Sequence, residues 1–177
     1  MNQSVYFQKA SLKSYLSLQF LVTVTLIIIG LFEGALSTLD LFLFSTPWIS
    51  YSIFFVLFIF YPVALPVLSI FIVTTLTDLY LNDLAASQTF AVIVSLLIVK
   101  RLVSFPEQRD FIEIWQSFII AMGFMVLIQI LSFMIIEWHL VNIQAIFFQF
   151  GITVLIYPFI HVIVTRLAHI FTQAATR

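Results

Sequence analysis

Long apolar runs separated by short polar stretches make up most of this chain of 177 residues. A helix that crosses the hydrocarbon core of a bilayer needs about 20 mainly apolar residues, and runs of about 17 can suffice. The runs show none of the alternation between polar and apolar positions that is typical of membrane-spanning strands. The pattern therefore predicts an all-α chain with six helices, over residues 15–36, 47–61, 63–81, 88–103, 111–136 and 143–167.

Two of these helices have alternative interpretations. The second is short and lies between Pro47 and Pro62. It crosses the bilayer fully, begins earlier in the apolar run 41–44, or lies partly in the interface. The first helix is followed by small residues that weakly resemble a signal-peptide cleavage site. Its apolar stretch is longer than that of a typical signal peptide, so we expect it to be retained.

The composition indicates a membrane protein. Hydrophobic residues make up 63% of the chain and charged residues 8%, whereas soluble domains average roughly 45–50% and about 25%. The length allows one integral membrane domain, residues 1–177, with no room for a soluble catalytic domain beside it. The absence of cysteine excludes disulfides and thiolate chemistry. A net charge of -1 without a basic run gives no footprint for nucleic-acid binding.

All basic residues fall on one side of a six-span arrangement. They lie before the first helix, around the end of the fourth and near the end of the last: Lys9, Lys13, Lys100, Arg101, Arg109, Arg166 and Arg177. The other side carries acidic residues, Glu33 among them, and no Lys or Arg. Because cytoplasmic loops carry the excess of Lys and Arg, we expect both termini in the cytoplasm and a multi-pass protein of the bacterial cytoplasmic membrane.

A carboxylate, Asp78, lies inside the third apolar run, where a charge is costly. Thr74, Thr75, Asp78 and Asn82 have spacings that place them on one helical face. One interpretation is that Asp78 is a boundary residue, which reaches interfacial water or caps the turn that follows. The other is that it faces the bundle interior and holds neighbouring helices, or a partner, in register. The sequence favours neither interpretation over the other.

The last predicted helix carries a polar residue at every fourth position: Gln149, Thr153, Tyr157, His161, Thr165 and His169. Such a row forms a continuous polar ridge on a helix. Pro158 lies in the same helix and leaves the carbonyl of Val154 to be satisfied by a neighbour or by water. We expect the ridge to bond to other helices, with the wall of a polar cavity as the alternative.

Motifs of known enzyme classes are missing. The chain has no H-E-x-x-H, no G-x-S-x-G and no phosphate-binding Gly-rich loop. Asp78 and Asp83 are five residues apart, a spacing at which a helix does not align two carboxylates. His161 has no carboxylate or second histidine close to it in sequence, which is weak evidence for a metal. We therefore expect no enzymatic activity, no cofactor and no metal.

Three features of the chain resemble the MreD family, the small integral membrane component of the bacterial rod-shape system. The first is the order of a leading span, a short second span and Leu65-Pro66 ahead of a helix that ends in an aspartate. The second is the stretch IVTTLTDLYLNDLAA over residues 72–86, and the third is Tyr157-Pro158 in the last helix. The chain departs from the family at its glycines, which threonines before the aspartate and an Asn-Asp pair after it replace.

The resemblance implies a non-enzymatic scaffold of the wall-elongation complex. Its partners would be an MreC-like bitopic membrane protein, the actin-like MreB and the peptidoglycan synthase pair RodA and PBP2. The residues expected to serve partner binding or bundle structure are Asp78, Thr75, Asn82, Tyr157 and Pro158. The family fold is also similar to the substrate-binding subunits of energy-coupling-factor vitamin transporters. The alternative is therefore a small-molecule carrier, with a pocket lined by Asp78 and by the ridge from Gln149 to His161.

Overall fold

The structure is a computed structural model and describes residues 12–38, 47–62, 64–80, 87–103, 110–136 and 143–175. Six helices fill these ranges: α2 (Leu12–Thr38), α3 (Ile49–Phe60), α4 (Val67–Tyr80), α5 (Ser87–Leu102), α6 (Phe111–Ile136) and α7 (Ile143–Ala175). No strand occurs in these six ranges. The predicted all-α fold is confirmed, and each predicted segment holds one helix.

Three of the helices are long and apolar enough to cross a membrane. The qualifying segments, in α2, α6 and α7, are Leu16–Leu36, Phe111–Ser132 and Ile143–Ala168. Helices α3 and α4 are apolar but shorter, with 12 and 14 residues. At a rise of ~1.5 Å per residue, α3 is about 18 Å long, against a hydrocarbon core of about 30 Å. The chain thus has the helices of a membrane protein, and six full crossings remain a prediction.

Large apolar side chains cover the outside of the bundle. Phe20, Ile135 and Phe159, from three different helices, are each 72% exposed. Soluble monomers rarely expose this many large apolar side chains. In a bilayer the same side chains contact acyl chains, so the outer surface fits hydrocarbon.

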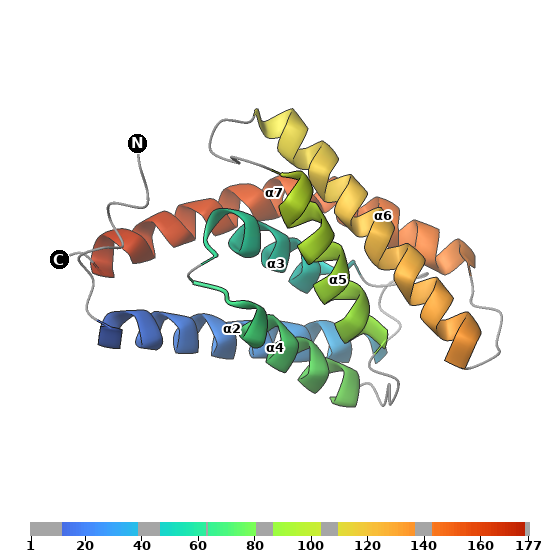
Figure 1. The fold of residues 1–177 in the computed structure, drawn as a ribbon, viewed down its shortest axis with the longest axis horizontal. Coiled ribbons are helices and arrows are strands. Elements are labelled where there is room, and N and C mark those ends of the chain that lie inside the picture. The colour runs from blue at the N-terminus through green and yellow to red at the C-terminus, as the bar shows by residue number, and fades with distance from the viewer. Residues whose placement is uncertain are drawn as a thin grey trace.

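The short helix α3 lies at the centre of the bundle. It contacts α2, α5 and α7, and in Figure 1 it lies between α7 and α2. Nine of its 12 residues are buried. Its sequence, ISYSIFFVLFIF, is apolar or small on every side. A helix of this composition has no face suited to water, which explains its place in the core.

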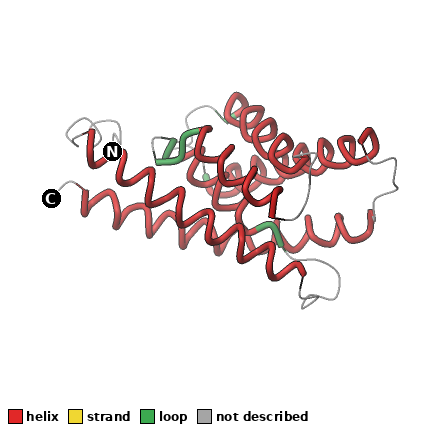
Figure 2. Tube along the Cα trace, turned by 90° about the horizontal axis from the view of Figure 1, so that it is seen from below, coloured by secondary structure: helices red, strands yellow, loops and turns green. Residues whose placement is uncertain are grey.

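The remaining helices pack around α3 in pairs. Helix α2 lies beside α4, α5 lies beside α6, and α4 also contacts α5. Helix α2 begins and α7 ends at the same end of the bundle, on the left of Figure 1 and again on the left of Figure 2. This arrangement brings the last turns of α2 and α4 to the same end as the first turns of α3, α5 and α7.

The contact between α2 and α4 depends on a glycine. A Cβ atom added to Gly30 would lie 2.9 Å from Oγ1 of Thr77, closer than real Cβ contacts. The Thr77 hydroxyl donates to the carbonyl of Val73 at 3.0 Å, which holds it in place. The same helix pair is joined by a hydrogen bond between the hydroxyls of Thr23 and Ser69, at 2.9 Å. Small residues thus allow the two helices to approach closely.

Candidate functional site

Asp78 points into the bundle and binds the start of α5. Its side chain is 1% exposed. Its Oδ2 accepts hydrogen bonds from the backbone N–H of Thr89 at 2.9 Å and from the Thr89 hydroxyl at 2.6 Å. Thr89 is the third residue of α5, so its N–H has no acceptor within the helix. A negative charge is also favourable at a helix N-terminus. Asp78 therefore faces the interior of the bundle, and it also caps the N-terminus of α5.

The other polar residues of this predicted face have separate surroundings. Thr74 is buried, and its hydroxyl donates to the carbonyl of Ile70 at 2.8 Å. The hydroxyl oxygen of Thr75 is buried and has no hydrogen-bond partner among the described residues. Asn82 lies outside the described residues. On this face the Thr74 hydroxyl and Oδ2 of Asp78 have hydrogen-bond partners, whereas the buried hydroxyl of Thr75 has none among the described residues.

Tyr157 is the centre of an aromatic cluster that joins α3, α6 and α7. Its side chain is 0% exposed. Its ring stacks on Phe118 with centroids 3.9 Å apart and 13° between the planes, and meets Phe55 edge-on at 5.8 Å. Phe55 and Phe118 also meet edge-on, at 5.2 Å. Aromatic pairs contribute about 0.5–1.5 kcal/mol each beyond their buried area, so this cluster fixes three helices together.

His161 extends the cluster by one turn of α7. Its Nδ1 lies 3.2 Å from the hydroxyl of Tyr157. Its ring contacts the rings of Phe60 and Phe111, both at 5.5 Å between centroids. In the described part of the chain, no group of three or more His, Cys, Asp or Glu side chains is placed to hold a metal ion. The surroundings of the His161 ring are thus aromatic side chains, those of Phe60, Phe111 and Tyr157.

The carbonyl that Pro158 leaves without its helical donor is satisfied by a neighbouring helix. The indole N–H of Trp115, in α6, donates to the carbonyl oxygen of Val154 at 3.2 Å. At the preceding residue, the hydroxyl oxygen of Thr153 accepts from the backbone N–H of Trp48 at 2.9 Å. Of the two partners expected for the Val154 carbonyl, a neighbour or water, the structure shows a neighbour, and the polar ridge of α7 bonds to another segment at Thr153.

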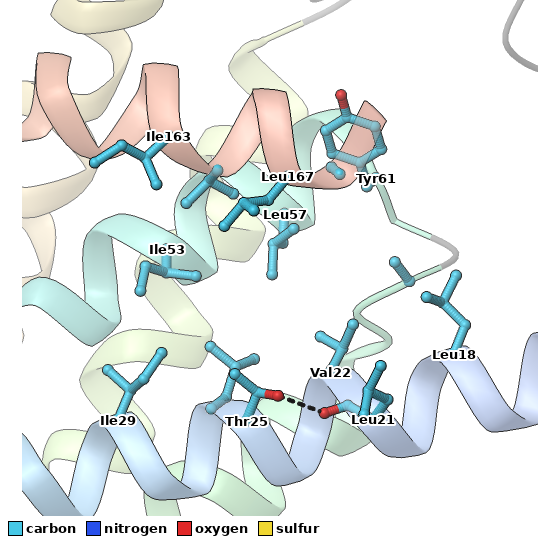
Figure 3. Close-up of a pocket in the computed structure, with 14 residues that line it drawn as sticks. Leu18, Leu21, Val22, Thr25, Ile29, Ile53, Leu57, Tyr61, Ile163 and Leu167 are labelled. Atoms are coloured by element: carbon cyan, nitrogen blue, oxygen red, sulfur yellow. Dashed lines mark hydrogen bonds between the residues drawn. The ribbon is translucent and has the colours of Figure 1, made fainter. Parts of the chain in front are cut away.

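An apolar groove of about 410 Å³ lies between α2 on one side and α3 and α7 on the other (Figure 3). We call it the α2–α7 groove. Its main walls are Leu18, Val22 and Ile29 of α2 with Ile163 and Leu167 of α7. Two of the lining residues, Thr25 and Tyr61, carry hydroxyls, and that of Thr25 donates to the carbonyl of Leu21 at 2.9 Å. The groove thus offers few groups to a polar ligand.

A smaller, polar cavity of about 230 Å³ lies at the opposite end of α2. We call it the Glu33 pocket. Every described helix lines it with a polar side chain: Glu33 of α2, Ser50 of α3, Thr74 and Thr77 of α4, Gln88 of α5, Gln129 of α6 and Gln149 of α7. Oε2 of Glu33 accepts from the backbone N–H of Ser50 at 2.8 Å and from its hydroxyl at 2.7 Å. The carboxylate is thereby held at the start of α3.

The Glu33 pocket was not predicted from the sequence. Its three glutamines lie on three different helices, so no local spacing connects Gln88, Gln129 and Gln149. Of the residues expected to line a pocket, Gln149 lines this one, whereas Asp78 is not among its lining residues. The sequence did contain an indication of this pocket. Glu33 and the three glutamines all fall toward one side of the predicted six-span arrangement, the side that lacks Lys and Arg.

Comparisons with known proteins found no relative of this chain. No protein-family model matches the chain, and no curated protein or solved structure matches it. The MreD family therefore remains a resemblance carried by the residues named above, and what it implies about function is a proposal.

Proposed function

We propose that the chain is a non-enzymatic membrane scaffold that docks the transmembrane helix of a partner in the α2–α7 groove. The observation that carries the proposal is the groove itself, an apolar cleft between two helices long enough to span a membrane. Following the resemblance, the partner is an MreC-like bitopic protein of the bacterial cytoplasmic membrane. It belongs to the wall-elongation complex with MreB, RodA and PBP2.

The chemistry of the groove selects an apolar occupant. Its walls are mainly Leu, Ile and Val side chains. The Thr25 hydroxyl already donates within its own helix. A polar ligand would lose its hydration in this groove and find few hydrogen-bond partners, which is costly. An apolar helix face loses nothing on entering the groove and gains close packing.

The dimensions of the groove suit a helix. It follows α2 from Leu18 to Ile29, which is about 16 Å at a rise of ~1.5 Å per residue, or three turns. Ala64 and Ala168 also line it, and such small residues allow another backbone to approach. Association of helices in lipid is driven by packing of this kind.

Asp78, Tyr157 and Pro158 support this role from inside the bundle. Asp78 is 1% exposed and Tyr157 is 0% exposed, so both contact helices of the chain itself. Asp78 holds α4 to α5, and the Tyr157 cluster holds α7 to α3 and α6. In the proposal these residues keep the walls of the groove in place, and the docking face lies on α2 and α7.

Co-purification in detergent with an MreC-like partner tests the proposal. Ala168→Trp fills the groove, and we expect this variant to lose most of the bound partner. Leu155→Trp is the control, because Leu155 is 68% exposed on the same helix outside the groove, and we expect it to retain the partner. A wild-type protein that never retains such a partner, or an Ala168→Trp variant that retains it fully, contradicts the proposal.

A second candidate function is a small-molecule carrier, for which the Glu33 pocket is the candidate binding site. The pocket is polar and formed by all the described helices. Its volume of about 230 Å³ is below the ~300–1,000 Å³ of typical ligand sites, so a vitamin-sized ligand does not fit it well. Recovery of a tightly bound vitamin from the purified protein would replace the scaffold proposal with the carrier.

A further inference from the structure

We infer that the Glu33 pocket is a binding site for a small organic cation, which it holds by the ammonium group. The site lies at one end of α2, whereas the α2–α7 groove follows the earlier turns of this helix. The inference goes beyond the scaffold function and does not depend on it.

The charge of Glu33 is the first part of the argument. Among the residues that the structure describes, no Lys or Arg side chain lines the pocket. The described basic side chains belong to the last turn of α5 and the second half of α7, and Lys100 lies over the ring of Phe58 at 4.7 Å. A carboxylate in an apolar bundle takes up a proton unless a positive charge compensates it. A cationic ligand supplies that charge.

The hydrogen-bonding state of the pocket is the second part. The hydroxyls of Thr74 and Thr77 each donate to a carbonyl of their own helix, at 2.8 and 3.0 Å. The hydroxyl of Ser50 donates to Glu33 at 2.7 Å. Oε1 of Gln129 is buried and has no hydrogen-bond partner among the described residues. Since these hydroxyl protons are already used, the oxygens that face the pocket act as acceptors.

A pocket rich in acceptors suits a ligand rich in donors. A primary ammonium group carries three N–H donors and accepts none. Its hydrogen bonds to a carboxylate are charge-assisted and stronger than neutral ones. The amide N–H groups of Gln88, Gln129 and Gln149 can donate to a ligand as well, but an anionic ligand would be repelled by the carboxylate of Glu33. The chemistry of the pocket therefore favours an ammonium group.

The size and remaining walls of the pocket indicate an organic cation. A water molecule takes about 30 Å³ of liquid volume, so a cavity of about 230 Å³ is larger than a single dehydrated ion. Trp48 and Phe54 also line the pocket. Aromatic rings of this kind attract cations and provide apolar contact for an alkyl group. A primary amine with a short alkyl chain matches these features.

Thermal unfolding of the full chain in detergent, with three chloride salts at equal ionic strength, tests the inference. We expect ethylammonium to raise the Tm saturably, and sodium and tetramethylammonium, which has no N–H donor, to have little effect. Glu33→Gln removes the charge and should abolish the response. Glu113→Gln is the matched control, because Glu113 is an exposed carboxylate in the first turn of α6 and does not line the pocket.

A second variant keeps the inference testable if Glu33→Gln does not fold. Gln129→Leu removes one acceptor and keeps the carboxylate, and we expect the apparent Kd for ethylammonium to rise roughly tenfold, as loss of one hydrogen bond to a charged group implies. The inference is wrong if sodium or tetramethylammonium stabilises the protein as much as ethylammonium. It is also wrong if ethylammonium has no effect, or if its effect persists unchanged in both variants. Partner binding by Ala168→Trp is a separate readout.

Discussion

The indole N–H of Trp115 donates to the carbonyl oxygen of Val154 at 3.2 Å, and this bond joins α6 to α7. Val154 precedes Pro158 by four residues. A proline has no N–H, so this carbonyl lacks the donor that any other residue at 158 would supply. The bond from Trp115 replaces an intrahelical hydrogen bond with an interhelical one.

Replacing Trp115 by Phe should destabilise the bundle. The variant keeps an aromatic ring but leaves the carbonyl of Val154 without a donor, at a cost of about 1–3 kcal/mol. Equilibrium unfolding in detergent, followed by circular dichroism, measures the change in the free energy of unfolding. The control is a double-mutant cycle with Pro158→Ala, which restores an N–H at residue 158. We expect Trp115→Phe to cost less in the Pro158→Ala background, and equal costs in both backgrounds would contradict the assigned role.

Asp78→Ala should destabilise the junction of α4 and α5. The change removes the acceptor of two hydrogen bonds from Thr89, and hydrogen bonds to a charged group contribute about 1.5–3 kcal/mol each. Asp78→Asn keeps one acceptor oxygen and should cost less. Arg166→Ala is the control, because Arg166 is an exposed charged residue of α7. Thermal unfolding in detergent ranks the three variants by Tm. An Asp78→Ala protein as stable as the wild type would contradict the role of Asp78 in joining α4 to α5.

Gly30→Ala and Gly123→Ala form a matched pair with opposite expectations. A Cβ atom on Gly30 would lie 2.9 Å from Thr77 Oγ1, whereas one on Gly123 meets nothing within 4 Å. Alanine is a better helix former than glycine by about 1 kcal/mol, so Gly123→Ala should be neutral or stabilising. Gly30→Ala should be destabilising by about 1–3 kcal/mol, the usual cost of overpacking.

The measurement for this pair is again thermal unfolding in detergent. Combining Gly30→Ala with Thr77→Ala removes the oxygen that the new methyl group meets, and we expect the double variant to recover part of the lost stability. Equal Tm changes for Gly30→Ala and Gly123→Ala would show that the close approach of α2 and α4 is not needed.

The helices could be predicted because their signal is local. Each apolar run is long relative to the polar stretches between them, and the described helices overlap those runs. The largest difference is at α7, which continues past the predicted end at residue 167 to Ala175. The need for a donor at Val154 could also be predicted, because it follows from the covalent structure of Pro158. Its identity as Trp115 could not, because it depends on how α6 packs against α7.

The direction of Asp78 and the Glu33 pocket depend on the rotation of each helix about its axis. An apolar helix in lipid carries little amphipathic signal that would set this rotation. The sequence therefore does not decide whether the Asp78 side chain faces the interface or the interior, whereas its hydrogen bonds from Thr89 place it in the interior. The polar lining of the pocket comes from residues on all the described helices, a convergence that no single segment encodes.

The central position of α3 has a consequence for the order in which the bundle is assembled. Helix α3 contacts α7 more extensively than its neighbours in sequence, and its Phe55 meets Tyr157. Helix α7 is the last of the described helices to be synthesised. A helix of about 18 Å is too short to be held across the bilayer by its own hydrophobicity. The burial of the α3 side chains is therefore complete only after α7 has been synthesised and has packed against them.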